Sequence, residues 1–247
     1  MDHFAKGAVS NNFAYRTSIL GRKMMSRISR QIILIEGPIG AGKTSLALRL
    51  AEDLEAKGLE ARAFLEFDPD HPIRTEQVDL LSGREPEANA YGLEPWARLT
   101  AQCVVNRGIV LLDATLIQNT LLPAFAAGVP EEQILHLATA RLAALAKAKP
   151  MVVYLHVDNM ADHLERLHRS STPTWSASNL AWIDGTLWAQ ARGQRGMAAL
   201  IGFHEAWQIW VETWLAQLGD TSLVLRAQSE EITTLSQVVL NHAAKPS

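Results

Sequence analysis

Short apolar runs separated by amphipathic stretches make up most of this chain of 247 residues. Five runs have the length and composition of buried strands, at residues 31–36, 60–67, 108–113, 151–157 and 222–226. Apolar residues spaced three or four apart predict helices at 44–57, 73–82, 89–106, 115–127, 131–147, 158–168, 200–218 and 229–241. Strands that are apolar throughout are buried on both faces. The pattern therefore predicts an α/β fold, with a doubly wound, parallel, five-stranded sheet and helices on both faces.

Residues 170–196 interrupt this alternation. They contain Ser, Thr, Gly, Pro and three tryptophans, Trp175, Trp182 and Trp188, without a clean period. We predict a mobile or irregular segment that serves as a lid. Its tryptophans either cover a ligand or anchor the segment to the body. By contrast, Trp207, Trp210 and Trp214 lie on one helical stripe and are predicted to pack in the core.

The most informative motif joins the first predicted strand to the first predicted helix and reads Gly37-Pro38-Ile39-Gly40-Ala41-Gly42-Lys43-Thr44. Its spacing is that of a phosphate-binding loop, in which backbone N–H groups and a helix N-terminus hold a polyphosphate. We predict that the loop and Ser45 bind ATP, and that Lys43 faces solvent until it contacts the β- and γ-phosphates. Thr44 is the predicted Mg²⁺ ligand.

Three carboxylates follow the second and third predicted strands, at the edge where ligands of such sheets bind. Glu66 and Asp68 share one side if strand 60–67 continues through them, and either could accept the proton of an acceptor hydroxyl. Asp113 ends a run of four apolar residues, which is typical of a carboxylate that reaches Mg²⁺ or its water shell. The structural alternatives are a solvated or turn-forming Asp68 and an Asp113 that caps a helix.

Two pairs of arginines follow the fourth predicted strand, Arg166 with Arg169 and Arg192 with Arg195. We predict that the first pair contacts the nucleotide. The second pair is predicted to close with the lid onto the transferring phosphoryl group, where arginines stabilise developing charge. The alternative for each arginine is a solvated surface charge.

Charge and cysteine content limit the classes of partner. The formal charge is −3, but residues 1–30 carry six basic side chains against one acid, a net +5, so the remainder is −8. An acidic body argues against a nucleic-acid surface, and no apolar stretch reaches the ~18 residues that span a bilayer. A single cysteine, Cys103, suits a reducing cytoplasm. We expect a cytoplasmic protein whose partner is a small molecule, with a homodimer left open and with structural roles for Cys103 and His71.

The chain is expected to form one domain. Residues 1–30 are predicted to be a basic, disordered extension, although their composition superficially fits an organellar transit peptide. Residues 31–247 are predicted to form the folded domain, with its lid at about 170–196.

These motifs resemble the nucleoside and nucleotide kinase branch of the P-loop fold, which includes deoxynucleoside kinases, thymidylate kinases and chloramphenicol phosphotransferases. The residues that carry the resemblance are Glu36 to Thr44, Leu65 to Asp68, and Tyr154 to Val157 followed by Arg166 and Arg169. The chain is more closely similar to uncharacterised bacterial P-loop kinase-like proteins, through Leu65-Glu66 with His71-Pro72, Asp113 to Asn119, and Arg192-Gly193 with Gly202-Phe203. The resemblance covers roughly residues 31–226.

One departure from the family pattern bears on the acceptor. Asp113-Ala114-Thr115 stands where deoxynucleoside kinases carry Glu-Arg-Ser and thymidylate kinases Asp-Arg-Tyr, so the arginine is missing there. The resemblance implies an ATP- and Mg²⁺-dependent kinase that phosphorylates a neutral hydroxyl, nucleoside-like or of a natural product, rather than a monophosphate. The alternatives are a nucleotide hydrolase, a non-catalytic nucleotide-binding switch, and a kinase of nucleic-acid ends.

Overall fold

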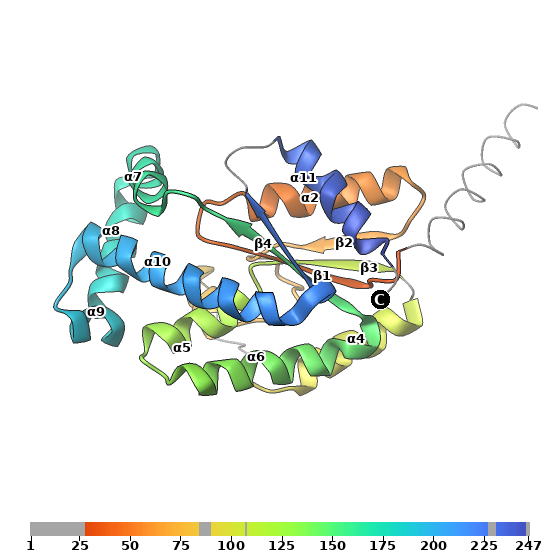
Figure 1. Cartoon of the computed structure of the whole chain (residues 1–247), viewed down its shortest axis with the longest axis horizontal. Helices are drawn as coiled ribbons and strands as arrows, with labels where there is room; N and C mark the ends of the chain where they lie inside the picture. The colour runs from red at the N-terminus through yellow and green to blue at the C-terminus, as the bar shows by residue number, and fades with distance from the viewer. Residues whose placement is uncertain (1–27, 84–89, 107, 227–230, 246–247) are drawn as a thin grey trace, which may run out of the picture.

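The computed structural model describes residues 28–83, 90–106, 108–226 and 231–245 (Figure 1). Within these residues one parallel sheet of five strands has the order β2-β3-β1-β4-β5. Its strands are β1 (Ile32–Glu36), β2 (Ala61–Phe64), β3 (Ile109–Asp113), β4 (Pro150–His156) and β5 (Ser222–Arg226). The predicted doubly wound sheet is therefore confirmed.

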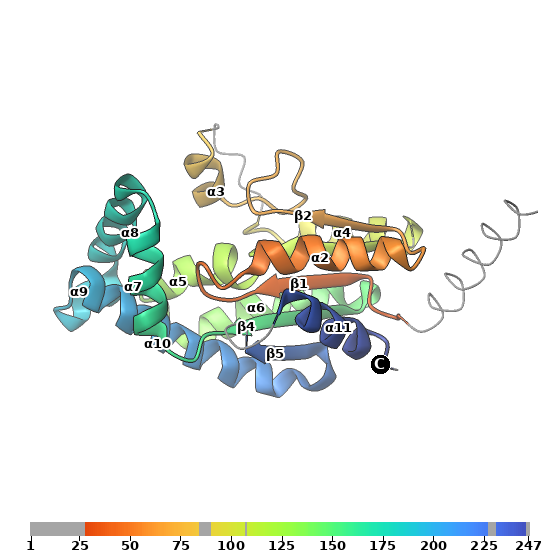
Figure 2. The ribbon, with the colours of Figure 1, turned by 90° about the horizontal axis from the view of Figure 1, so that it is seen from above.

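Helices cover both faces of this sheet, as the two views show (Figures 1 and 2). Helices α2 and α11 lie on one face, and α4, α5, α6 and α10 lie on the other. Helices α7, α8 and α9 lie at one end of the molecule (Figure 2). Their bounds are α2 Lys43–Ala56, α3 Glu76–Leu81, α4 Glu94–Asn106, α5 Leu122–Ala126, α6 Glu131–Leu145, α7 Met160–Ser170, α8 Pro173–Gly185, α9 Leu187–Arg192, α10 Gly196–Leu215 and α11 Ile232–Ala243.

The core has two layers because successive side chains of a strand point to opposite faces. In β1, Ile32 and Leu34 pack in the layer of α10, whereas Ile33 and Ile35 pack in the layer of α2. The predicted stripe of α10 contributes to the first layer. Trp207 and Trp214 are buried there, and Trp207 stacks on the half-buried Trp210 with ring centroids 5.0 Å apart.

Several predicted elements differ from the structure by a few residues, and two of the differences affect the site. Strand β2 ends at Phe64 rather than at residue 67, because the chain turns there and the Asp68 N–H donates to the Leu65 carbonyl over 3.0 Å. Residues 170–196 are not irregular but fold into α8 and α9. Both helices begin at a capping threonine, Thr172 and Thr186, whose hydroxyl accepts a backbone N–H three residues later.

The described fold begins before residue 31. Arg30 is buried, and its guanidinium donates to the carbonyls of Pro150 and Asp220 at 3.2 and 2.8 Å. Most of the predicted basic extension, residues 1–27, lies outside the described residues. None of the helices that the structure describes is both long enough and apolar enough to cross a lipid bilayer.

Candidate active site

The phosphate-binding loop connects the end of β1 to the start of α2, as predicted. Gly37 has φ of +147° and Gly40 has φ of +74°, in the region that favours glycine. Both also lie against neighbouring elements. A Cβ at Gly37 would lie 2.8 Å from the carbonyl oxygen of Leu155, and one at Gly40 would lie 2.9 Å from the Leu167 side chain on α7. The loop is therefore fitted between β4 and α7, which leaves glycine as the residue that fits.

Lys43 is the first residue of α2. Contrary to the prediction, its side chain does not face solvent. It is 7% exposed, and its Nζ donates to the Pro38 carbonyl over 2.9 Å. Burial lowers the pKa of Lys43, and the negative charges of Asp113, Glu66 and Glu36 oppose that shift. The ammonium is therefore folded back onto its own loop, where the charges of three carboxylates act on it.

The side chains of Thr44, at the start of α2, and Asp113, at the end of β3, are in contact. Asp113 pairs with Ile35 in the sheet register, which brings its carboxylate beside the loop. The Thr44 hydroxyl donates to Asp113 Oδ2 over 2.5 Å. Burial raises the pKa of Asp113, while the bond from Thr44 and the charge of Lys43 lower it. A hydroxyl and a carboxylate this close are the hard oxygen donors that Mg²⁺ prefers.

This donor set fits Mg²⁺ rather than a metal held by protein ligands alone. Among the residues that the structure describes, no group of three or more His, Cys, Asp or Glu side chains could hold a metal ion. Mg²⁺ is usually bound through one or two protein groups, with water and substrate phosphates completing its shell. Thr44 and Asp113 supply protein groups of this kind.

Glu66 lies in the turn that follows β2, and its carboxylate faces the same crevice. Its Oε1 accepts a hydrogen bond from Gln118 Nε2 over 3.0 Å, and the Asn119 side chain also donates to this carboxylate. Burial raises the pKa of Glu66, and the nearby charge of Lys43 is the largest influence that lowers it.

Asp68 makes different hydrogen bonds from Glu66. Because β2 ends at Phe64, the two acids do not share a strand face. The Oδ2 of Asp68 accepts the backbone N–H of Leu65 over 2.8 Å, and the Asp68 carbonyl accepts from Arg74 over 2.9 Å. These contacts correspond to the turn-forming alternative, so Glu66 is the better placed of the two acids for the predicted role of base.

Sequence reasoning missed Glu36, the last residue of β1. It is fully buried, and its two carboxylate oxygens accept the backbone N–H groups of Leu116 at 2.6 Å and Gln118 at 3.2 Å. Burial raises its pKa to about 7, against the lowering effect of these N–H groups and of Lys43. The only sequence signal was its place directly before the glycine loop.

His71 ties the turn that carries Glu66 to the end of β3. Its Nδ1 accepts the Ile73 N–H over 3.1 Å, so Nε2 carries the proton and donates to the Thr115 hydroxyl over 3.1 Å. The hydroxyl in turn donates to the carbonyl of Asp113 over 3.1 Å. Burial lowers the pKa of His71 to about 4. These contacts agree with the predicted structural role of His71.

The four predicted arginines lie on the exposed surface of the helices around the site. Arg169 pairs with Glu165 over 3.5 Å on α7, and Arg166 is exposed on the same helix. The Arg192 guanidinium lies 4.2 Å over the Trp188 ring, and Arg195 is exposed at the start of α10. The structure thus brings together the loop, Thr44 with Asp113, and Glu66, but not these arginines. Their roles remain predictions.

The tryptophans of 170–196 anchor this segment to the body. Trp182 and Trp188 each pack edge-on against the ring of Phe203 on α10, with ring centroids 5.4 Å apart. Trp175 lies 5.3 Å from the ring of His168 on α7. The anchoring alternative therefore describes their packing.

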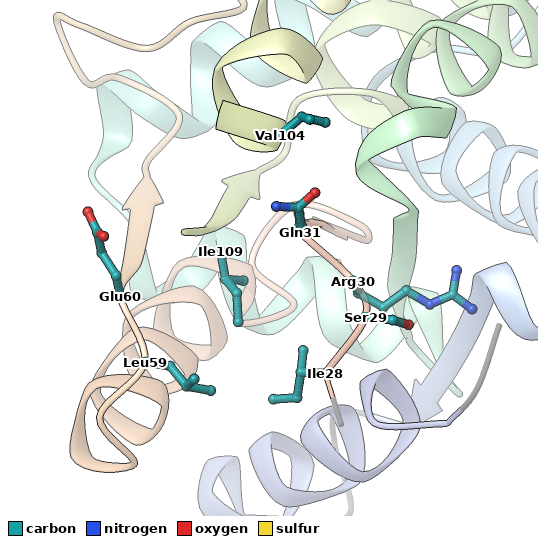
Figure 3. A pocket seen from close by; sticks show the side chains of 8 residues that line it. All are labelled: Ile28, Ser29, Arg30, Gln31, Leu59, Glu60, Val104 and Ile109. Atoms are coloured by element: carbon teal, nitrogen blue, oxygen red, sulfur yellow. The ribbon is translucent and has the colours of Figure 1, made fainter. Parts of the chain in front are cut away.

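A hollow elsewhere in the molecule is separate from this site. It has a volume of about 310 Å³ and lies at the amino ends of β1 and β3 (Figure 3). Its lining residues are Ile28, Ser29, Arg30, Gln31, Leu59, Glu60, Val104 and Ile109. The phosphate loop lies at the opposite, carboxyl end of β1.

An all-parallel sheet of this strand order, with a phosphate-binding loop between β1 and α2, has the α/β fold of P-loop kinases. No protein-family model matches the chain, and no curated protein matches it in sequence. Among solved structures, the chain is similar to thymidylate kinase from Candida albicans over 87% of this chain and 94% of that one. The sequence identity is 15% and the TM-score 0.45.

Proposed function

We propose that this protein is an ATP- and Mg²⁺-dependent phosphotransferase that phosphorylates a hydroxyl of a small molecule. The observation that carries the proposal is the convergence of three features at the carboxyl end of the sheet. These are the glycine loop with Lys43, the oxygen pair of Thr44 and Asp113, and the carboxylate of Glu66. Each corresponds to one requirement of phosphoryl transfer, namely phosphate binding, metal binding and proton acceptance.

The loop and α2 supply the donor side of the proposed reaction. The loop amides and the N-terminus of α2 would bind the β- and γ-phosphates, with Ser45 beside them. On binding, Lys43 would exchange the Pro38 carbonyl for a phosphate oxygen. Thr44 and Asp113 would hold Mg²⁺, which neutralises phosphate charge when it is bound.

Glu66 is the proposed general base on the acceptor side. The acceptor hydroxyl would give its proton to the Glu66 carboxylate while its oxygen forms a bond to the γ-phosphorus. The bond from that phosphorus to the bridging oxygen breaks in the same step, and its electron pair leaves with ADP. Burial raises the pKa of Glu66, and a stronger base accepts the proton more readily.

The proposed lid is the segment 170–196, which lies at the end of the molecule where α7 packs against the loop (Figure 2). Closure would bring Arg192 or Arg195 to the transferring group and Arg166 and Arg169 to the nucleotide. The acceptor class that we propose is nucleoside-like or a natural product, in line with the sequence resemblance.

The test is a screen of nucleosides and hydroxylated natural products with γ-labelled ATP, with mass detection of the phosphorylated product. Glu66→Gln is the matched variant, because it keeps the shape of the side chain but removes the base. We expect it to reduce transfer by roughly 10²–10⁴-fold with little change in ATP affinity.

Three outcomes would contradict the proposal. Fast release of phosphate with no labelled product from any acceptor would indicate a hydrolase, whereas slow release to water is the background activity of a kinase that lacks its acceptor. ATP binding with neither transfer nor hydrolysis would indicate a non-catalytic binding protein. Unchanged transfer in Glu66→Gln would remove Glu66 as the base.

A further inference from the structure

An unusual backbone follows Asp113. Ala114 has φ of +57°, a left-handed conformation that is uncommon for a residue with a side chain. Residues Ile117–Leu121 then form a π-helical turn. Such turns are rare and concentrate at functional sites, as does backbone strain. This turn therefore calls for a functional explanation.

Buried hydrogen bonds hold the turn in place. Glu36 accepts from the backbone N–H groups of Leu116 and Gln118, so the end of β1 fixes the start of the turn. The Thr120 hydroxyl donates to the Thr115 carbonyl over 2.7 Å. The turn is thus built on the same strand end that leads into the phosphate loop.

The turn presents two neutral amides to one carboxylate. Gln118 Nε2 donates to Glu66 Oε1 over 3.0 Å, and the Asn119 side chain donates to the same carboxylate. Glu66 needs such support because β2 ends at Phe64, so no strand pairing fixes its backbone. A freely rotating carboxylate would be drawn to the ammonium of Lys43 nearby, whose charge already acts on it.

We infer that Gln118 and Asn119 are positioning residues that hold the Glu66 carboxylate toward the acceptor and away from Lys43. This inference rests on the proposed function, because it assigns Glu66 the role of base. Neutral amides suit this role, since they fix the direction of a carboxylate without neutralising its charge. A lysine or arginine in their place would form an ion pair with the base.

The test measures ATP turnover with water as acceptor, by phosphate release, in Gln118→Leu, Glu66→Gln and the double variant. Gln31→Leu is the matched control, because Gln31 is also half-buried and donates to a carbonyl over 2.9 Å, but at the amino end of the sheet. We expect Gln118→Leu to lower kcat roughly tenfold or more, as for the loss of a hydrogen bond to a charged group. The KM for ATP should stay unchanged.

The double variant separates positioning from a merely structural role. If Gln118 acts through Glu66, Gln118→Leu should not slow an enzyme that already carries Glu66→Gln. If the double variant instead loses kcat by the product of the two single losses, the inference is overturned. It is also overturned if Gln118→Leu alone keeps the wild-type kcat while Glu66→Gln is slow. That second result would leave the proposed function standing, whereas wild-type turnover in Glu66→Gln would overturn both.

Two further measurements keep the inference testable. Gln118→Asn retains the backbone bond to Glu36 but shortens the side chain, so it should show the same loss of kcat if Gln118→Leu does not fold. The ¹⁵N signal of the Gln118 side-chain amide should move when Glu66 is replaced by Gln. An unmoved signal would overturn the inference whatever the turnover.

Discussion

Replacing Glu36 by Gln should alter how the stability of the protein depends on pH. The carboxyl is fully buried at the end of β1, and burial raises its pKa from 4.5 to about 7. Between these two values the folded protein keeps the Glu36 proton, whereas the unfolded chain has lost it. The unfolded state then binds fewer protons, so the free energy of unfolding falls as pH rises. Glu36 therefore contributes stability that is complete below pH 4.5 and is lost as pH rises to about 7.

The expected size of this effect is roughly 3 kcal/mol, because each pH unit between the two pKa values corresponds to about 1.4 kcal/mol. Glu36→Gln has no proton to lose, so its contribution should be flat over this range. The variant also carries a constant cost. Its amide nitrogen must face one of the two N–H groups that Glu36 accepts, from Leu116 and Gln118, which removes a buried hydrogen bond worth roughly 1–3 kcal/mol.

The assay is urea unfolding of both proteins at several values between pH 4.5 and 8. Near pH 4.5 the variant should be less stable than the wild type by this constant cost, roughly 1–3 kcal/mol. By pH 7.5 the wild type has lost roughly 3 kcal/mol, so the variant should be as stable as the wild type or more stable. Buried carboxyls that both proteins share, such as Asp113, contribute equally to the pH dependence of the free energy of unfolding in the two proteins. Parallel curves for the two proteins would refute the reasoning, since they would mean that Glu36 has the same pKa in both states.

Three further predictions concern other parts of the structure. Lys43→Ala should lower turnover by roughly 10²–10³-fold and reduce stability at neutral pH, because the carboxylates of Glu36, Asp113 and Glu66 lose the charge of this cation; kinetics and denaturation would show both, and wild-type turnover would contradict the site. His71→Asn should flatten the loss of stability below pH 6.5, since the folded protein resists protonating this ring until about pH 4; an unchanged slope in pH-dependent melting would rule this out. Hydrogen exchange in residues 170–196 should slow when a non-hydrolysable ATP analogue binds with Mg²⁺, and equal protection in both states would exclude a lid.

The sheet and the glycine loop could be predicted from the sequence because both depend on patterns of neighbouring residues. Apolar runs predict β1, β3 and β4, and the glycine spacing predicts the loop. The end of β2 was misjudged because a side chain, Asp68, satisfies the Leu65 N–H and allows the chain to turn. Helix α8 was missed because its apolar residues, among them Trp175, Trp182 and the buried Ile183, do not follow one stripe.

Long-range contacts of the site could not be predicted from spacing. Gln118 and Glu66 are 52 positions apart, and their meeting depends on the turn that Glu36 anchors. No local pattern records such a contact. The burial of Lys43 likewise depends on the surrounding fold, because the same loop sequence leaves the direction of the free lysine open.

Helix α7 rests directly on the phosphate loop. His163 Nε2 donates to the Ile39 carbonyl over 2.7 Å, and the Leu167 side chain occupies the space that a side chain at residue 40 would need. Any tilt of α7 must therefore displace the loop. If the loop binds ATP as proposed, the affinity for nucleotide and the orientation of α7 would share one coupling free energy, which acts equally in both directions. A molecule that binds α8 and tilts α7 would change the affinity for ATP by the same factor by which ATP changes the affinity for that molecule.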